Sequence, residues 1–274
     1  ATAKRIAAGS YGVQIPGQYD DEIGELVSTI NDMSVKIGQA EKTQTEFISS
    51  VSHELRTPLT AISGWGETLL TSENLDAETR RGVVIIAREA KRLTGMVEEL
   101  LEFTRMQDGR FTLHVETADI LAEFEDTVFM YGNRLKQEGI CLHYDGCEED
   151  IPEIPCDVAR MRQVFLNILD NAAKHGGEET PSLSGGEGKR IDASIAHEDR
   201  FVVIRIRDYG PGIPEEELPR VKLKFYKGSS KARGSGIGLA VCEEIVTMHG
   251  GTLTLENAEG GGTLVTICIP TGEE

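Results

Sequence analysis

A heptad pattern of apolar residues dominates the N-terminal part of the chain and limits what this part can fold into. From Ile23 to Val51, apolar or small side chains recur every three or four residues, although Gln44 weakens the pattern. It continues to Leu69 after two successive steps of four residues, which mark a stutter where a coiled coil locally unwinds. The sequence therefore predicts one long helix over residues 23–71.

A second helix is predicted over residues 76–107, where an apolar seam runs from Val83 to Thr104. A short turn between the two helices would make an antiparallel hairpin. One hairpin has too little core to stand alone, so two copies should pair into a four-helix bundle. We therefore expect a homodimer.

Beyond residue 108, short strand-like segments and helical segments follow one another irregularly. The expected strands are Phe111–Val115, Ile140–Tyr144, Arg190–Ala196, Phe201–Arg207, Thr252–Glu256 and Thr263–Ile269. The expected helices are Ile120–Gln137, Val158–His175 and Ile237–His249. The segment Gly176–Lys189 is rich in Gly, Ser, Pro and Glu, and we expect a mobile surface loop there. This irregular order predicts an α+β sandwich.

The acidic composition excludes several classes of partner. The formal net charge is -18, whereas nucleic acids and anionic lipid surfaces are bound by clustered Lys and Arg. A bound polyphosphate would need backbone amides, a metal ion or a local basic patch. Residues 220–233 carry several Lys and Arg and no acid, so they are the candidate patch. The 5 cysteines form no CxxC pair, and we expect reduced thiols in an intracellular protein rather than a metal site.

His53 lies on the long predicted helix and faces away from its apolar seam. It falls about 160° from the line of the seam residues, and Thr57, four residues on, shares its face. Pro58 cannot donate to the carbonyl of Glu54 and should bend the helix. A lone exposed histidine is usually an ordinary surface residue. A zinc protease of the HExxH type is excluded, because Thr57 stands where its second histidine would be.

Three motifs in the C-terminal part are weak when each is taken alone. Asn167 and Asn171 lie one helical turn apart, as in many polar surface stripes. Asp208–Gly212 follows a predicted strand and is compatible with an ordinary tight turn. Gly234–Leu239 opens a helix, where free backbone N–H groups can bind phosphate. It is neither a dinucleotide fingerprint nor a P-loop, because no strand precedes it and no Lys-Ser/Thr pair follows.

Taken together, these motifs resemble the bacterial sensor histidine kinases. The string His53–Pro58 resembles the H box of that family. The order Asn171, Asp208, Phe225-Tyr226 and Gly234–Gly238 resembles the N box, first G box, F box and second G box of its ATP-binding domain. That domain is also similar to the ATPase domains of gyrase and of one class of heat-shock chaperone.

The N-terminal stretch is similar to part of a HAMP linker, with Asp21–Leu26 resembling its second helix. HAMP linkers normally follow a membrane-spanning helix, so the resemblance implies a native protein in the cell membrane with this part on the cytoplasmic side. The longest unbroken apolar stretch here, Val83–Ala87, is far short of the ~18 residues that span a bilayer. Because the chain begins at Ala1 in mid-pattern, we expect a fragment of a longer protein.

The resemblance implies three domains and a two-step reaction. Residues 1–45 would be a partial HAMP and signalling helix, 46–108 the dimerisation and phosphotransfer domain, and 109–274 the catalytic ATP-binding domain. The kinase would phosphorylate His53 from MgATP and pass the phosphoryl group to an aspartate of a response regulator. Glu54 would fix the imidazole tautomer, and Thr57 would position a water that removes the phosphoryl group.

The resemblance also assigns roles around the nucleotide. Asp208 would accept a hydrogen bond from the adenine amino group, Asn171 would bind Mg²⁺, and Lys174 would reach phosphate. The residues expected to contact the nucleotide are Asn167, Asn171, Lys174, His175, Asp208, Gly210, Gly212, Ile213, Tyr226, Lys227, Gly234, Ser235, Gly236, Ile237, Gly238, Leu239 and Thr263. Residues 220–233 would form a lid over the triphosphate, and a solvated loop is the alternative.

Two departures from the family pattern affect the lid. Lys222 stands where an aromatic residue is usual, and Lys227 stands where an Arg is usual; Lys cannot make a bidentate contact. Two other functions remain open at this point. An ATPase clamp of the gyrase and chaperone type would label no protein, and a non-catalytic dimeric scaffold would have lost residues such as Asn171 or Asp208.

Overall fold

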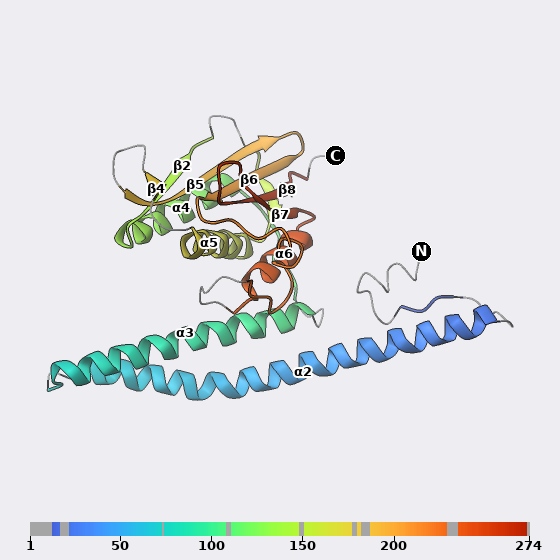
Figure 1. The fold of residues 1–274 in the computed structure, drawn as a ribbon, viewed down its shortest axis with the longest axis horizontal. Coiled ribbons are helices and arrows are strands. Elements are labelled where there is room, and N and C mark those ends of the chain that lie inside the picture. The colour runs from blue at the N-terminus through green and yellow to red at the C-terminus, as the bar shows by residue number, and fades with distance from the viewer. Residues whose placement is uncertain are drawn as a thin grey trace. The chain divides into compact units, whose positions relative to one another are not determined.

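The computed structural model describes residues 13–16, 22–72, 74–107, 111–147, 151–176, 180–181, 187–228 and 235–272. The chain divides into two units, Ala1–Phe111 and Thr112–Glu274, which are described separately (Figure 1). Among the described residues, no helix has both the length and the apolar character needed to cross a bilayer.

The first unit is an antiparallel pair of long helices, α2 (Glu22–Leu70) and α3 (Ala77–Gln107). The helix α2 continues through Pro58 without a break and curves in its second half (Figure 1). At the start of α3, Asp76 accepts hydrogen bonds from the backbone N–H of Thr79 at 2.9 Å and from its hydroxyl at 2.6 Å. These bonds hold the pKa of Asp76 below its usual value and fix the turn between the helices.

Several small residues of α2 and α3 are buried, and one pair lies in close contact. Ser52 and Ala90 are buried. Gly66 lies so close to Ala87 that an added Cβ would be 3.0 Å from the Ala87 Cβ. The larger side chains of the predicted seam remain exposed: Phe47, Leu55, Ile62, Trp65 and Leu69 on α2, and Ile86 and Leu93 on α3. The first unit thus buries these small residues together with Val97, Leu101, Phe103 and Met106 of α3, and leaves an apolar stripe exposed.

The N-terminal segment Val13–Pro16 is attached to α2 by side-chain hydrogen bonds. Asn31 Oδ1 accepts from the backbone N–H of Ile15 at 2.8 Å, and Asn31 Nδ2 donates to the Ile15 carbonyl at 3.3 Å. The Ser34 hydroxyl donates to the Val13 carbonyl at 3.3 Å. One asparagine side chain thus satisfies both backbone groups of a single residue.

The second unit contains a mixed sheet in the order β2-β5-β6-β8-β7. Its strands are β2 (Ile140–Asp145), β5 (Glu187–Glu198), β6 (Phe201–Asp208), β7 (Thr252–Asn257) and β8 (Thr263–Pro270). The pair β2 and β5 is parallel, whereas β5-β6, β6-β8 and β7-β8 are antiparallel. A separate two-stranded sheet pairs β1 (Glu116–Ala118) with β3 (Ile154–Cys156).

Three helices cover one face of this sheet: α4 (Ile120–Gln137), α5 (Val158–His175) and α6 (Gly238–Met248) (Figure 1). The core between helices and sheet is apolar, with Phe124 of α4 and Phe165 of α5 fully buried in edge-to-face contact at 5.0 Å between ring centroids. The predicted α+β sandwich is confirmed.

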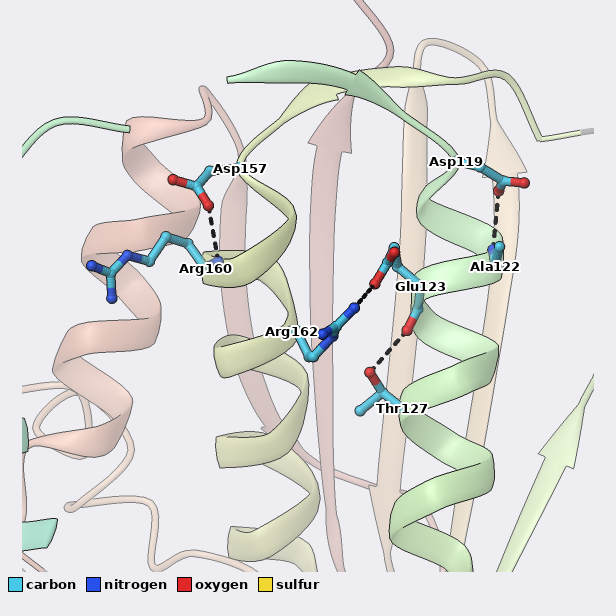
Figure 2. Close-up of polar contacts among 7 residues, drawn as sticks. All are labelled: Asp119, Ala122, Glu123, Thr127, Asp157, Arg160 and Arg162. Atoms are coloured by element: carbon cyan, nitrogen blue, oxygen red, sulfur yellow. Dashed lines mark hydrogen bonds and ion pairs between the residues drawn. The ribbon is translucent and has the colours of Figure 1, made fainter. Parts of the chain in front are cut away.

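Side-chain caps fix where the helices α4 and α5 begin, and an ion pair joins the two helices (Figure 2). Asp119 accepts a hydrogen bond from the first turn of α4 at 3.0 Å, and Asp157 accepts one from the Arg160 N–H at 3.1 Å. An ion pair between Arg162 and Glu123 then joins α5 to α4. These caps explain why both helices begin where the sequence predicts.

The predicted strands differ from the structure in two places: one predicted strand is absent, and one observed strand had no prediction. Residues 111–115 form no strand, because the His114 N–H donates to the Asp157 side chain at 2.8 Å instead of to a neighbouring strand. The strand β3 was not predicted, because Pro155 is a turn signal in sequence. Proline is nevertheless tolerated in a strand at a sheet edge, and β3 has only β1 as a partner.

The prediction of a loop over residues 176–189 is also wrong in part. The strand β5 begins at Glu187, and a short strand β4 (Thr180–Pro181) pairs with it. Residues 177–179 and 182–186 lie outside the described residues.

Candidate functional site

His53 lies on the exposed side of α2, as the sequence predicts. Glu54 and Thr57 are exposed as well. The neighbouring Ser52 is fully buried, and its hydroxyl donates to the Ile48 carbonyl at 2.7 Å. The first unit therefore presents the imidazole outward, next to a residue that packs inside the hairpin.

The expected bond between Glu54 and His53 is not seen among the described residues. Successive residues on a helix point about 100° apart, so a contact between their side chains needs particular rotamers. The role of Glu54 therefore stays a prediction, as does that of Thr57.

Asp208 stands at the end of β6 with its carboxylate held by the backbone. The side chain is 6% exposed. Its Oδ1 accepts from the Gly210 N–H at 2.8 Å and from the Thr263 N–H at 3.1 Å. The described part of the chain gives no hydrogen bond to the other oxygen, Oδ2. One oxygen thus fixes the carboxylate, and the second can accept a hydrogen bond from a ligand.

Close approach of the backbone around Asp208 requires glycine. Gly262 has φ +85°, and an added Cβ would overlap the Asp208 carbonyl oxygen. Gly212 has φ +75°, and its Cβ would stand 2.7 Å from Asn257 Oδ1. The loop after β6 and the turn between β7 and β8 are therefore in direct contact.

The helix α5 brings the predicted asparagine stripe to the same place. Its C-terminal end lies beside Asp208, since a Cβ added to Gly176 would be 3.6 Å from the Asp208 Cβ. Desolvation lowers the pKa of His175, although the nearby Asp208 carboxylate acts in the opposite direction. Asn167, on the same helix, contacts the start of α6: a Cβ on Gly238 would be 3.9 Å from its Cγ.

The glycine-rich segment before α6 meets the F-box residues. Gly236 has φ +74°, and its Cβ would be 2.9 Å from the Tyr226 carbonyl oxygen and 3.0 Å from the Phe225 carbonyl carbon. Ser235 Oγ accepts from the Ile237 N–H at 3.2 Å. The structure therefore brings together the predicted residues 235–239 and Tyr226. Gly234 lies outside the described residues, as do Lys231 and Arg233.

Two basic residues of the expected lid, residues 220–233, make contacts within the protein. Lys222 pairs with Glu243 at 2.9 Å and donates to the Leu253 carbonyl at 2.9 Å, so its charge is used within the protein. Arg220 lies over the ring of Tyr226, 4.7 Å from its centroid. Lys224 and Lys227 are exposed and remain candidates for phosphate.

Lys174 is likewise paired within the protein. Its ammonium forms an ion pair with Asp170, one turn back on α5, and Asp170 also accepts from the Tyr131 hydroxyl at 2.9 Å. A phosphate at Lys174 would have to compete with this carboxylate.

A charged cluster on the other face of the sheet braces the same loop. The Tyr209 hydroxyl donates to Asp192 at 2.6 Å, and Arg190 donates to both oxygens of Asp192 at 2.5 and 2.9 Å. Arg207 lies over the Tyr209 ring at 4.6 Å and donates to the Glu259 carbonyl at 2.6 Å. Burial and the hydrogen bond to Asp192 raise the pKa of Tyr209.

This cluster and Asn257 were not predicted from the sequence. Asn257 ends β7 immediately before a glycine-rich turn, which is the only sequence signal of its role. Arg207 and Tyr209 flank Asp208, and alternation along a strand places them on the opposite face.

The donor set suits Mg²⁺ only if phosphates supply most of the ligands. No group of three His, Cys, Asp or Glu side chains in the described ranges could hold a metal ion. Asn171 offers one amide oxygen from α5, and Mg²⁺ commonly combines one or two protein ligands with phosphates and water. The residues present therefore fit a nucleotide-bound Mg²⁺ better than a free metal site.

Three families match successive parts of the chain. Residues 156–273 match the histidine kinase-, DNA gyrase B- and HSP90-like ATPases. Residues 43–109 match the His Kinase A phospho-acceptor domain, and residues 1–39 match the HAMP domain.

Curated relatives extend this similarity over nearly the whole chain. The signal transduction histidine-protein kinase AfsQ2 of Streptomyces coelicolor is 30% identical over 289 residues, which cover 98% of this chain and 51% of AfsQ2. The sensor histidine kinase YclK of Bacillus subtilis is 30% identical over 280 residues, covering 97% of this chain and 56% of YclK. The chain thus spans about half the length of these relatives.

Solved structures share the fold. Full-length ShkA in complex with AMPPNP superposes with a TM-score of 0.68 at 24% identity, covering 84% of this chain and 47% of ShkA. ThkA in complex with the response regulator protein TrrA gives a TM-score of 0.56 at 24% identity, covering 82% of this chain and 61% of that chain.

Proposed function

Because this chain belongs to the sensor histidine kinases of two-component systems, we propose that it transfers the γ-phosphoryl group of ATP to His53 and then to an aspartate of a response regulator. One combination carries the proposal: an exposed imidazole on the helical hairpin, and a backbone-held carboxylate, Asp208, with a free-facing oxygen in the sandwich. The domain limits near residues 45 and 108 belong to the same proposal.

Asp208 is the proposed adenine-binding group. A carboxylate oxygen accepts a hydrogen bond and cannot donate one, so it selects a base edge that carries an amino group. The Thr263 N–H orients this carboxylate. Gly210, Gly212 and Ile213 would line the base, since glycine allows close approach of the backbone.

The polyphosphate is assigned to the start of α6 and its surroundings. Residues Ser235–Leu239 lead into the N-terminus of α6, where first-turn backbone N–H groups and the helix dipole favour anions. Asn167 contacts this turn, and Tyr226 and Lys227 approach Gly236 from the other side. Mg²⁺ held by Asn171, when bound, would neutralise phosphate charge.

In the proposed transfer, a ring nitrogen of His53 attacks the γ-phosphorus. The new N–P bond forms as the bond to the β,γ-bridging oxygen breaks, and ADP leaves. The protein contributes orientation and electrostatic stabilisation, which are its main contributions in this reaction class. The AMPPNP bound to ShkA and the regulator TrrA bound to ThkA support the nucleotide and the partner proposed here.

A homodimer and a membrane anchor complete the proposal. The exposed apolar stripe of α2 and α3 supports pairing of two hairpins into a four-helix bundle. The HAMP match at residues 1–39 supports attachment of the native protein to a membrane.

The test is incubation of the chain with γ-labelled ATP. We expect acid-labile, alkali-stable label on the protein that is lost in His53→Gln and then moves to a response regulator when one is added. Released phosphate with no labelled protein would instead support an ATPase clamp. Absence of both nucleotide binding and label would support a scaffold.

A further inference from the structure

The loop that follows Asp208 is attached to the turn between β7 and β8 at both of its ends. At the first end, Thr263 donates to Asp208 at 3.1 Å, and Arg207 donates to the Glu259 carbonyl at 2.6 Å. At the second end, the attachment depends on Asn257. Its Oδ1 accepts from the Ile213 N–H at 2.7 Å, and its Nδ2 donates to the Ile213 carbonyl at 2.7 Å.

This pair of bonds holds one residue in the way that a neighbouring strand would. Both backbone groups of Ile213 are satisfied by one side chain that lies 44 residues further along the sequence. The turn that carries Asn257 is itself closed, because Ala258 N–H donates to Gly262 at 2.9 Å and Gly261 N–H donates to Ala258 at 3.0 Å. Asn257 therefore connects the loop to a well-bonded support.

Close packing of Gly212 against Asn257 and Gly262 limits which side chain position 257 can carry. A Cβ on Gly212 would be 2.7 Å from Asn257 Oδ1 and 3.4 Å from the Gly262 carbonyl oxygen. The side chain at position 257 must therefore be short enough to fit against Gly212, and it uses one atom as acceptor and a separate atom as donor. Asparagine is the shortest side chain that carries such an amide.

We propose that Asn257 is a positioning residue for nucleotide binding, which holds the loop Asp208–Ile213 in the conformation that accepts adenine. The proposal rests on the proposed function, because it assigns the base to Asp208. Asn257 itself is exposed and touches the loop rather than the core. Its removal leaves the fold intact and widens the range of loop conformations, so part of the binding energy is spent on ordering the loop.

The first measurement is the affinity of the full chain for MgATP by calorimetry. We expect Asn257→Ala to raise the Kd by about tenfold, as for loss of one net hydrogen bond. Asn257→Asp keeps the acceptor for the Ile213 N–H but places a second oxygen against the Ile213 carbonyl, so it should bind no better than the alanine variant. Kd values for ADP should rise by the same factor, because ADP carries the same base.

A matched control is available in the first unit. Asn31 makes the same pair of hydrogen bonds to a single residue, Ile15. Asn31→Ala removes equivalent chemistry in the other unit of the chain, and its Kd for MgATP should equal that of the wild type.

Kinetics separate positioning from loss of folded protein. We expect Asn257→Ala to raise the KM for ATP in the labelling reaction by about tenfold, with the maximal rate within about twofold of wild type. Its melting temperature without nucleotide should stay within about 3 °C of wild type. A lower maximal rate at unchanged KM would mean that the variant only reduces the amount of active protein, and would overturn the inference.

Two further outcomes are distinguishable. Wild-type protein that binds MgATP while Asn257→Ala binds equally well overturns the role of Asn257 and leaves the kinase proposal standing. Wild-type protein that does not bind MgATP overturns the proposed function, and the role of Asn257 with it.

Discussion

The two units of this chain solve the problem of burying apolar surface in opposite ways. In the sandwich, Phe124, Phe165 and Ile204 are fully buried within one copy of the chain. In the hairpin, small residues such as Ser52 and Gly66 are buried, while Trp65 is 69% exposed and Phe47 is 68% exposed. The sandwich thus buries a large apolar core within one copy, whereas the exposed stripe of the hairpin supports the proposed pairing with a second copy.

The largest expected effect lies in the sandwich core. Phe165→Ala removes a fully buried ring that contacts Phe124 and should lower the free energy of unfolding by about 3–5 kcal/mol. Urea unfolding followed by circular dichroism measures the change. The matched variant Phe129→Ala removes a ring that is 73% exposed, and it should have almost no effect. Equal losses in both variants would contradict the contrast between buried and exposed rings.

Substitutions in the apolar stripe of the hairpin should change how strongly two copies of the chain associate. Trp65→Glu replaces part of the apolar stripe with a charge and should weaken dimerisation by about 2–3 kcal/mol per protomer. Light scattering over a dilution series gives the dissociation constant. Thr60→Glu, on an exposed position of the same helix, adds the same charge without removing apolar surface and should leave the dimer intact. A wild-type chain that is monomeric at all concentrations would remove the basis of this prediction.

A smaller effect is expected where the start of α5 meets the end of α6. His249 Nε2 accepts from the Asp157 N–H at 2.9 Å, and the ring's Nδ1 lies 2.7 Å from the Ile245 carbonyl. His249→Ala leaves the Asp157 N–H without this acceptor and should cost about 1–2 kcal/mol of stability. His114→Ala is the control, because its side chain is exposed and only its backbone bonds Asp157.

The smallest expected effect is a pH dependence at Asp192. Burial acts to raise its pKa, but hydrogen bonds from Arg190 and Tyr209 outweigh it, so the pKa in the folded state lies below the ordinary value of 3.8. Its stabilisation is therefore present above that ordinary value and is lost as the pH falls through the lower pKa of the folded state.

Asp192→Asn should accordingly cost less than about 1 kcal/mol at pH 7, because the cluster is partly exposed. The difference from wild type should shrink as the pH falls below 3.8 and through the lower pKa of folded Asp192. Chemical unfolding of both proteins over a pH series tests this, and a difference that grows in acid would contradict the sign.

Features of the fold that depend on local sequence signals could be predicted from the sequence. The helices α4 and α5 begin where predicted, because their caps, Asp119 and Asp157, and their apolar periodicity are local signals. The strand β3 was missed because Pro155 suggests a turn unless its edge position is known. Local patterns also placed His53 on the outer side of its helix.

Contacts between distant residues were beyond the reach of these patterns. Lys222 belongs to the segment expected to form a lid over phosphate, and its pairing with Glu243 is set by tertiary packing. Asn257 and Ile213 are joined only because β7 ends beside the loop after β6. Motif order supplied most residues of the candidate site, which stay predictions, and the residues that support them could be found only from the fold.

The alternation of side chains along β6 determines which of its residues reach the candidate site. Asp208 points to the helix side, whereas Arg207 and Tyr209 point to the opposite face. Insertion or deletion of a single residue in β6 would exchange a carboxylate for a cation or a phenol at the position proposed for adenine. During evolution, the outer face of this strand can change by substitution, whereas a change in its length would also move Asp208 along the strand, away from the Thr263 N–H that holds it.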